Sequence, residues 1–108
     1  MIIYNVTCKV DSSREEEWIA WMRETHVPDV CKTGCFVSAK LLKLKYPADD
    51  EGVTYAIQYQ CPSMQVLDQY FNEHAEALQL EHSTKFGSDV VAFRTILEML
   101  GEYGIVNS

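Results

Sequence analysis

The sequence predicts an α+β protein with ferredoxin-like βαββαβ order, in which a four-stranded antiparallel sheet carries two helices on one face. Three observations lead to this expectation. Strand-like segments occur four times, two other segments have apolar residues at helical spacing, and the segments follow one another as β-α-β-β-α-β. Two right-handed βαβ crossovers on one antiparallel sheet place both helices on the same face.

The first strand and the first helix have the clearest patterns. Apolar residues alternate over residues 2–10, which predicts a strand with one face on the core. Ser13 and Glu16 fit a capping box at the start of the next helix, where consecutive glutamates also place negative charge at the positive end of the helix dipole. The core-facing residues of this helix recur at helical spacing and are Trp18, Trp21, Met22 and Thr25.

Proline and glycine divide the middle of the chain. Pro28 disfavours helical geometry at the preceding residue, so the first helix is expected to end or bend there. A short further turn is expected to end at Gly34, which suits a left-handed C-terminal cap. Residues 36–46 and 53–61 are the predicted second and third strands, joined by an exposed loop over residues 47–52.

One helix and one strand are predicted in the second half of the chain. Ser63 is the expected N-cap of a helix whose apolar face carries Leu67, Tyr70, Phe71, His74 and Leu78. A turn at residues 87–89 precedes a fourth strand over residues 90–100. Residues 1–100 are therefore expected to form a single domain, followed by a flexible tail over residues 101–108.

Composition narrows the classes of function. The 108 residues carry a formal net charge of −7, and a negative field repels phosphate backbones, so nucleic acid is not an expected partner. No apolar run approaches the ~20 residues of a membrane helix and no targeting segment is recognised, which favours a cytoplasmic protein without a membrane partner.

The four cysteines are expected to be reduced thiols, and the spacing of cysteines and histidines does not indicate a metal site. No dinucleotide, phosphate-loop or nucleophile-elbow motif is present, so no cofactor is predicted.

Apolar residues on both faces of several strands indicate that the sheet has a partner. The fourth strand, for example, has Val91, Phe93 and Leu97 on one side and Val90 and Ile96 on the other. Because the helices cover one face only, the economical arrangement is a homodimer whose sheets pack face to face. Such a dimer has a cleft between sheet and helices that suits a small ligand. The alternative is that both faces are partly buried and no ligand binds.

Several short segments resemble a family of short uncharacterised bacterial proteins, over residues 1 to about 100. These segments are Tyr4-Asn5-Val6, Trp18 with Trp21, His26-Val27-Pro28, Thr33-Gly34-Cys35-Phe36, Thr54-Tyr55-Ala56-Ile57-Gln58-Tyr59 and Ala92-Phe93-Arg94-Thr95. The resemblance implies the dimeric α/β-barrel version of the ferredoxin-like fold, with no assigned reaction. His26-x-Pro28 is also similar to a His-x-Pro element of another dimeric α/β-barrel family, which is linked to ether and polyketide metabolism.

His26 is the candidate catalytic residue. At the junction of the first helix with Pro28 its ring can project into a cleft, where a histidine can act as a general base near neutral pH. The alternative is a cation at the helix C-terminus that interacts with the helix dipole. His74 lies on the apolar face of the second helix and is interpreted either as a hydrogen-bonded core residue or as a ligand-binding residue. His82 is expected to be exposed to solvent.

Arg94 is the candidate anion-binding residue. It shares a strand face with Glu98, so it either holds an anionic ligand through its planar guanidinium or forms an ion pair on the sheet or across the dimer interface. Gln58 and Tyr59 are the candidate ligand-binding residues of the third strand. They point to opposite faces, and the sequence does not choose between them.

These features together predict a homodimeric small-molecule-binding protein, or a cofactor-independent enzyme with His26 as the base and Arg94 as the anion clamp. Proton transfer or oxygenation of an activated carbon is the chemistry suggested by analogy with other dimeric α/β-barrels. The alternative functions are a non-catalytic protein-interaction module and a ligand sensor.

Overall fold

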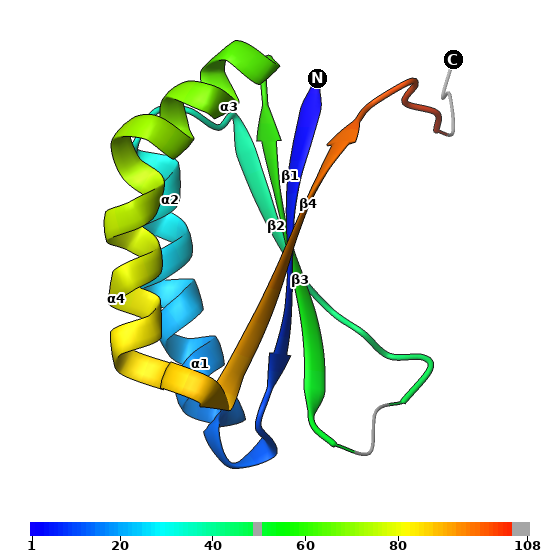
Figure 1. Ribbon diagram of the computed structural model, residues 1–108. Helices are drawn as coiled ribbons and strands as arrows, with labels where there is room; N and C mark the ends of the chain where they lie inside the picture. The colour runs from blue at the N-terminus through cyan, green and yellow to red at the C-terminus, as the bar shows by residue number, and fades with distance from the viewer. Residues whose placement is uncertain (49–50, 105–108) are drawn as a thin grey trace.

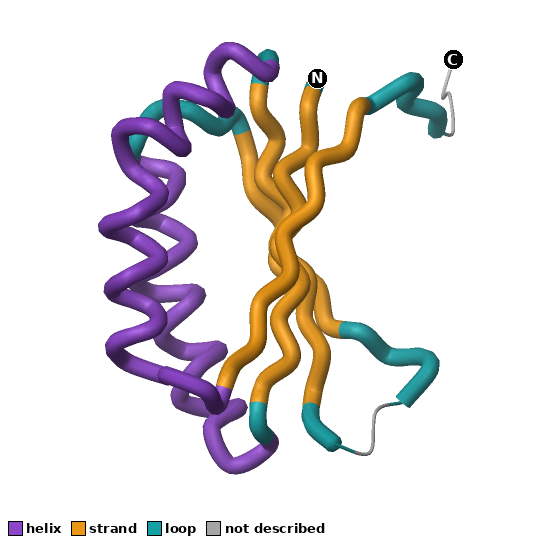
Figure 2. Tube along the Cα trace, in the orientation of Figure 1, coloured by secondary structure: helices purple, strands orange, loops and turns teal. Residues whose placement is uncertain are grey.

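The computed structural model describes residues 1–48 and 51–104, and in it helices cover one face of a twisted four-stranded sheet (Figure 1, Figure 2). The strands are β1 (Ile2–Val10), β2 (Ser38–Lys43), β3 (Val53–Cys61) and β4 (Val90–Glu98). They lie in the order β2-β3-β1-β4, and each neighbouring pair is antiparallel. The predicted ferredoxin-like fold is confirmed.

A π-helical turn separates two α-helical segments in each crossover. The first crossover consists of α1 (Glu15–Trp21), a π turn (Met22–His26) and α2 (Val27–Lys32). The second consists of α3 (Met64–Tyr70), a π turn (Phe71–Ala75) and α4 (Glu76–Phe86). Among the described residues, every helix is too short or too polar to span a lipid bilayer.

The first helix, which was expected to end or bend at Pro28, does not end there. The backbone N–H of Val27 donates to the carbonyl of Met22, five residues back, and the helix then continues through Pro28 to Lys32. Pro28 lies in the first turn of α2, directly after the widened turn, where a residue without a backbone N–H is tolerated. Gly34 follows with a φ of 82°, which fits the predicted left-handed cap.

The predicted capping box of Ser13 and Glu16 is not formed. Instead the Asp11 carboxylate accepts hydrogen bonds from the backbone N–H of Ser13 at 2.9 Å and from its hydroxyl at 2.7 Å. A short 3-10 turn (Ser12–Arg14) separates this cap from α1, so Ser13 lies outside the α-helix that it was expected to cap. Ser63 caps α3 as predicted, by accepting a hydrogen bond from the Val66 N–H at 3.2 Å.

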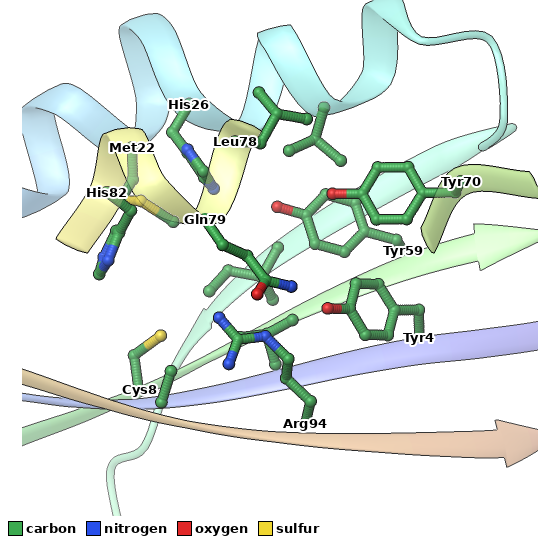
Figure 3. A pocket seen from close by; sticks show the side chains of 14 residues that line it. Tyr4, Cys8, Met22, His26, Tyr59, Tyr70, Leu78, Gln79, His82 and Arg94 are labelled. Atoms are coloured by element: carbon green, nitrogen blue, oxygen red, sulfur yellow. The ribbon is translucent and has the colours of Figure 1, made fainter. Parts of the chain in front are cut away.

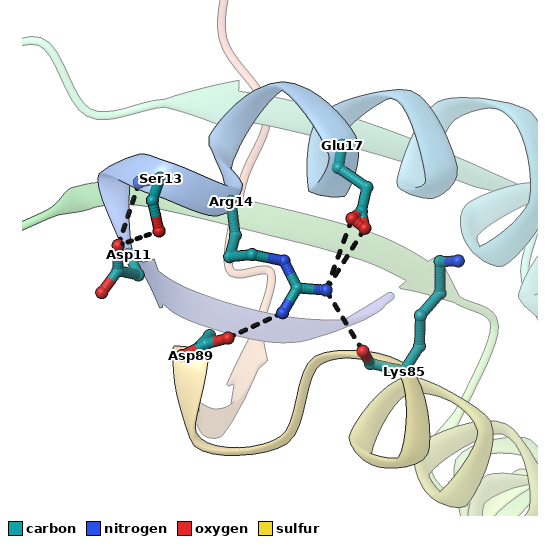
Figure 4. Close-up of polar contacts among 6 residues, drawn as sticks. All are labelled: Asp11, Ser13, Arg14, Glu17, Lys85 and Asp89. Carbon is teal, nitrogen blue, oxygen red and sulfur yellow. Dashed lines mark hydrogen bonds and ion pairs between the residues drawn. The ribbon is translucent and has the colours of Figure 1, made fainter.

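Arg14 ties the start of the first helix to the end of the second crossover (Figure 4). Its guanidinium donates to the Asp89 carboxylate at 2.6 Å, to the Lys85 carbonyl at 3.2 Å and to Glu17 at 3.3 Å. The backbone N–H of Asp11 also donates to the Asp89 carbonyl at 2.8 Å. The two loops that follow β1 and precede β4 are therefore joined.

Two strands are shorter than predicted. β2 covers residues 38–43 of the expected 36–46, and Phe36 is buried instead in an aromatic cluster. β4 ends at Glu98, because this residue lies opposite Ile2, the first residue of the neighbouring strand β1. One further backbone hydrogen bond follows, from the Met99 N–H to the Met1 carbonyl. Residues 49 and 50 of the predicted loop and residues 105–108 of the predicted tail lie outside the described residues.

The core lies between the sheet and the helices. Trp18, Ile57 and Leu67 have no exposed surface, and they come from the first crossover, the sheet and the second crossover respectively. Beside them an aromatic cluster has ring centroids 4.8–6.2 Å apart, within the range of favourable aromatic contacts. Its members are Tyr4, Phe36, Tyr59, Tyr70 and Phe71.

Candidate functional site

A cavity of about 30 Å³ lies between the sheet and the helices (Figure 3). This volume holds about one or two water molecules. The strands β1, β3 and β4 form one wall, and both crossovers form the other. Fourteen side chains line the cavity: Tyr4, Val6, Cys8, Met22, His26, Val30, Ile57, Tyr59, Tyr70, Leu78, Gln79, His82, Ala92 and Arg94.

Arg94 is the only lysine, arginine or carboxylate residue among the lining side chains. It lies opposite Val6 in the β1–β4 ladder and therefore faces the helices, and its guanidinium points into the cavity toward Gln79 of α4 (Figure 3). No carboxylate within residues 1–48 and 51–104 forms an ion pair with it, Glu98 included. An unpaired guanidinium beside an enclosed space is suited to binding an anion.

Three tyrosine hydroxyl groups point into the same space (Figure 3). Burial raises the pKa of Tyr4, Tyr59 and Tyr70, so all three are protonated phenols near neutral pH. For Tyr4, hydrogen bonds from Arg94 and Gln79 act in the opposite direction and lower the pKa in part. These phenols are neutral groups that can donate hydrogen bonds to a ligand.

His26 projects from the π turn of the first crossover toward the cavity (Figure 3). Its Nδ1 atom is buried and has no hydrogen-bond partner in the described part of the chain. Burial, together with the nearby His82, lowers the pKa of His26 to about 4, so the imidazole is neutral at pH 7. The alternative of a cation at a helix C-terminus is wrong, because the helix continues to Lys32.

His82 is not exposed to solvent as expected, but is half-buried in the wall of the cavity. Its Nε2 accepts a hydrogen bond from the Nε1–H of Trp18 at 3.0 Å, and its ring centroid lies 5.7 Å from that of His26. Burial and the charge of Arg94 lower the pKa of His82. His82 follows Leu78 by four residues, so the helical spacing of the apolar face already pointed to it.

The structure brings His26, Arg94 and Tyr59 together at one cavity. Gln58 pairs with Asn5 on the face of the sheet opposite the helices, because the ladder between β1 and β3 runs without a bulge. His74 is half-buried outside the lining, with its Nε2 3.8 Å from the Glu73 carboxylate.

Tyr4, Tyr70 and Gln79 line the cavity although their sequence context did not mark them as site residues. Tyr4 belongs to β1, Tyr70 to α3 and Gln79 to α4. These residues meet only because the strands and helices pack together. Cys8 also lines the cavity, where burial raises the pKa of its thiol to about 11 and keeps it protonated. No three histidine, cysteine or acidic side chains come together as a candidate metal site within the residues that the structure describes.

A groove of about 640 Å³ lies between α4 and β4 and adjoins the cavity. Gln79, His82, Ala92 and Arg94 line both spaces, so these four residues stand at the junction between them. Arg94 is exposed and lines the groove, so solvent reaches this residue.

Fold and site together define a ferredoxin-like α+β protein with a polar cavity between sheet and helices. The chain belongs to the family described as a domain of unknown function (DUF4286), whose model matches residues 1–100. This match confirms the predicted resemblance to an uncharacterised family. No curated protein matches the chain.

Two solved structures are similar in fold. One, from Bacillus halodurans C-125, is described as an ethyl tert-butyl ether d (EthD) family protein; it has a TM-score of 0.65 and 12% identity, with 93% of this chain and 100% of that chain covered. The other, from an uncultured marine organism, is described as a dimeric ferredoxin-like protein; it has a TM-score of 0.60 and 12% identity, with 94% and 97% covered. At these identities the similarity concerns the fold.

Proposed function

We propose that this protein is a homodimer that binds a small anionic molecule in the cavity between its sheet and helices. The observation that carries the proposal is the guanidinium of Arg94, which has no carboxylate partner among the described residues and is directed into a space whose other polar groups are neutral. Phenol groups and the Gln79 amide supply further hydrogen-bond donors.

Cofactor-independent catalysis is the second part of the proposal. With the anionic group of the ligand on Arg94, the neutral imidazole of His26 takes a proton from an acidic carbon or hydroxyl group of the ligand. The electron pair that stays on the ligand is then stabilised by Arg94 and by the hydroxyl of Tyr4. A pKa of about 4 makes His26 a weak base, but a bound anion raises this pKa by favouring the imidazolium.

The open face of the sheet supports the dimer. Leu42, Phe93 and Leu97 are 43%, 62% and 47% exposed on this face, where they lie on the two edge strands, and exposed apolar side chains favour an interaction surface. Two copies that pack these faces together would bury them in an isologous interface. The similar fold of a protein described as dimeric agrees with this arrangement.

Native mass spectrometry of protein purified gently from its own source tests the proposal. We expect a dimer that carries additional small-molecule mass, and an Arg94→Gln dimer that carries none. Arg94→Lys is the matched control, because it keeps the charge and loses the planar fork of donors; it should retain the ligand with lower occupancy. A bare wild-type dimer would contradict ligand binding and favour a protein-interaction module. A bare monomer would contradict the dimer as well.

The catalytic part needs its own measurement. Once the added mass identifies the ligand, His26→Ala should still carry that ligand and keep the dimer mass, but lose turnover. Turnover at the wild-type rate in this variant would remove His26 from the mechanism.

A further inference from the structure

We infer that the ligand is a monocarboxylate with an apolar body, and that the groove between α4 and β4 holds this body while the carboxylate lies at Arg94. The inference rests on the proposed function, because it names the chemical class of the ligand bound at Arg94.

The sizes of the two spaces lead to this division of the ligand. The inner cavity of about 30 Å³ has room for one small polar group only. The adjoining groove of about 640 Å³ falls within the roughly 300–1,000 Å³ typical of small-molecule sites. Because Arg94 lines both spaces, a molecule whose anionic group reaches the guanidinium has to extend outward into the groove.

The lining of the groove is mixed, with apolar side chains on both walls beside the polar ones. The polar and charged lining residues are Glu76, Gln79, His82, Ser83 and Arg94. Phe71 and Leu80 come from the second crossover, and Val90 and Ala92 come from β4. Leu80 is 63% exposed, which is a large exposed fraction for a leucine that borders a concave surface. An apolar ligand body would remove this surface from water.

The charges around the groove favour a monoanion and set its direction. Glu76 is the only carboxylate in the groove lining and Arg94 is its only guanidinium, with no lysine. Glu76 repels a second negative charge, as does a chain of net charge −7, so a dianion is disfavoured. A planar carboxylate can accept two parallel hydrogen bonds from one guanidinium. The rest of such a ligand is uncharged and is therefore not repelled by Glu76.

Isothermal titration calorimetry with butanoate, octanoate and 1-octanol tests the class of ligand. We expect octanoate to bind at least about tenfold more tightly than butanoate, because its additional methylene groups are buried in the groove. We expect 1-octanol, which has the same body without the charge, to bind more weakly than octanoate. Arg94→Gln should remove this advantage of octanoate over 1-octanol.

A pair of variants on α4 tests the groove itself. Leu80→Glu introduces a negative charge into the groove and should weaken octanoate binding by about tenfold or more, while butanoate binding changes little. Ala77→Glu is the matched control: it adds the same charge on the same helix at an exposed position that does not line the groove, and it should bind both acids as wild type does. Both sites are exposed, so neither variant should prevent folding.

The outcomes separate this inference from the proposed function. Equal affinities for butanoate and octanoate would overturn the role of the groove and leave the site at Arg94 standing. Equal affinities for octanoate and 1-octanol would overturn the carboxylate. If neither acid binds although the native dimer carries a small-molecule mass, the ligand class is wrong and the proposed function stands; if the native dimer is also bare, both are wrong.

Discussion

The two faces of the sheet use alternate residues of the same strands in different ways. On the face toward the helices, Tyr4 and Tyr59 are 3% and 2% exposed and form part of the core. On the opposite face, Asn5 donates hydrogen bonds to Thr7 at 3.1 Å and to Thr95 at 3.3 Å, and all three side chains remain at least partly exposed. The side chains of the helix-facing side are thus buried by the helices of the same chain.

The opposite face of the sheet, in contrast, is not covered by helices (Figure 1). Its centre is polar, while its edge strands β2 and β4 carry the exposed apolar side chains of Leu42 and Phe93. The helix-facing side is largely apolar but contains two polar residues at the cavity. Among the described residues, Arg94 has no carboxylate partner and His26 Nδ1 has no hydrogen-bond partner. The proposed dimer would cover the first of these faces, and the proposed anionic ligand would contact the polar groups of the second.

The largest expected effect comes from removing a side chain on the helix-facing side. Ile57 has no exposed surface, so Ile57→Ala should lower the free energy of unfolding by about 2–5 kcal/mol through lost burial and a residual cavity. Leu42→Ala on the open face is the control; the leucine is 43% exposed, and its loss should cost less than about 1 kcal/mol in the monomer. Urea unfolding measures both. Equal losses in dilute protein would contradict the contrast between the faces.

The next effect concerns the pH dependence of stability. The imidazole of His26 takes a proton near pH 6.5 when unfolded but only near pH 4 when folded, because burial disfavours its charged form. The unfolded state therefore binds more protons in this window, so the contribution of His26 to stability is complete above pH 6.5 and is lost as the pH falls toward 4. From the size of the shift we expect a loss of up to about 3 kcal/mol.

His26→Leu removes this titration and is the matched control. Its free energy of unfolding should fall less than that of wild type between pH 6.5 and pH 4, when both are measured by urea unfolding. Parallel pH profiles for the two proteins would show that the burial of His26 does not control its protonation.

A charge on the open face should weaken association without disturbing the core. Phe93 is 62% exposed and lies opposite Thr7, so Phe93→Asp should leave the fold intact but raise the dimer dissociation constant at least about tenfold, because the carboxylate would be desolvated in the interface. Analytical ultracentrifugation measures this constant. Ala77→Asp adds the same charge to α4, away from the sheet, and should not change it. Dissociation by both variants alike would indicate a different interface.

The smallest expected effect lies at the edge of the helix-facing side. The Tyr55 hydroxyl donates to the Glu15 carboxylate at 2.8 Å, which also lies 3.3 Å from the Lys43 ammonium. Tyr55→Phe should lower the free energy of unfolding by about 1 kcal/mol through loss of this hydrogen bond. Tyr46→Phe makes the same chemical change at a residue that is 87% exposed, and should have no measurable effect. Thermal unfolding of the two variants compares them.

Local periodicity predicted the elements well where a strand has partners along its whole length. β1 and β3 have the predicted bounds, because both are central strands with one face in the core. The edge strands β2 and β4 are shorter than predicted, since the end of an edge strand depends on where its single neighbour ends. Apolar alternation in the sequence carries no information about that neighbour.

The candidate site was predicted only in part. Arg94 and His26 were predicted to act together as anion clamp and base, and both line the cavity, but the other side chains that meet them there were not predicted. The exposure of His82 was predicted wrongly, although its spacing of four residues from Leu78 places it on the apolar face of the helix. Its hydrogen bond with Trp18, which lies 64 residues away in the chain, could not be read from the sequence. Gln58 and Tyr59 could not be separated, because alternation does not show which face of a sheet the helices cover.

The sequence by itself determined the order of the elements, the alternation of side chains along each strand and the net negative charge. These properties depend on local backbone geometry and on composition, so a single chain read in order is sufficient. Only the tertiary structure decided that Tyr4, His26, Tyr59, Gln79 and Arg94 surround one cavity. Their meeting requires the pairing of β1 with both β3 and β4 and the packing of both crossovers on one face, and these contacts join parts of the chain that are far apart in sequence.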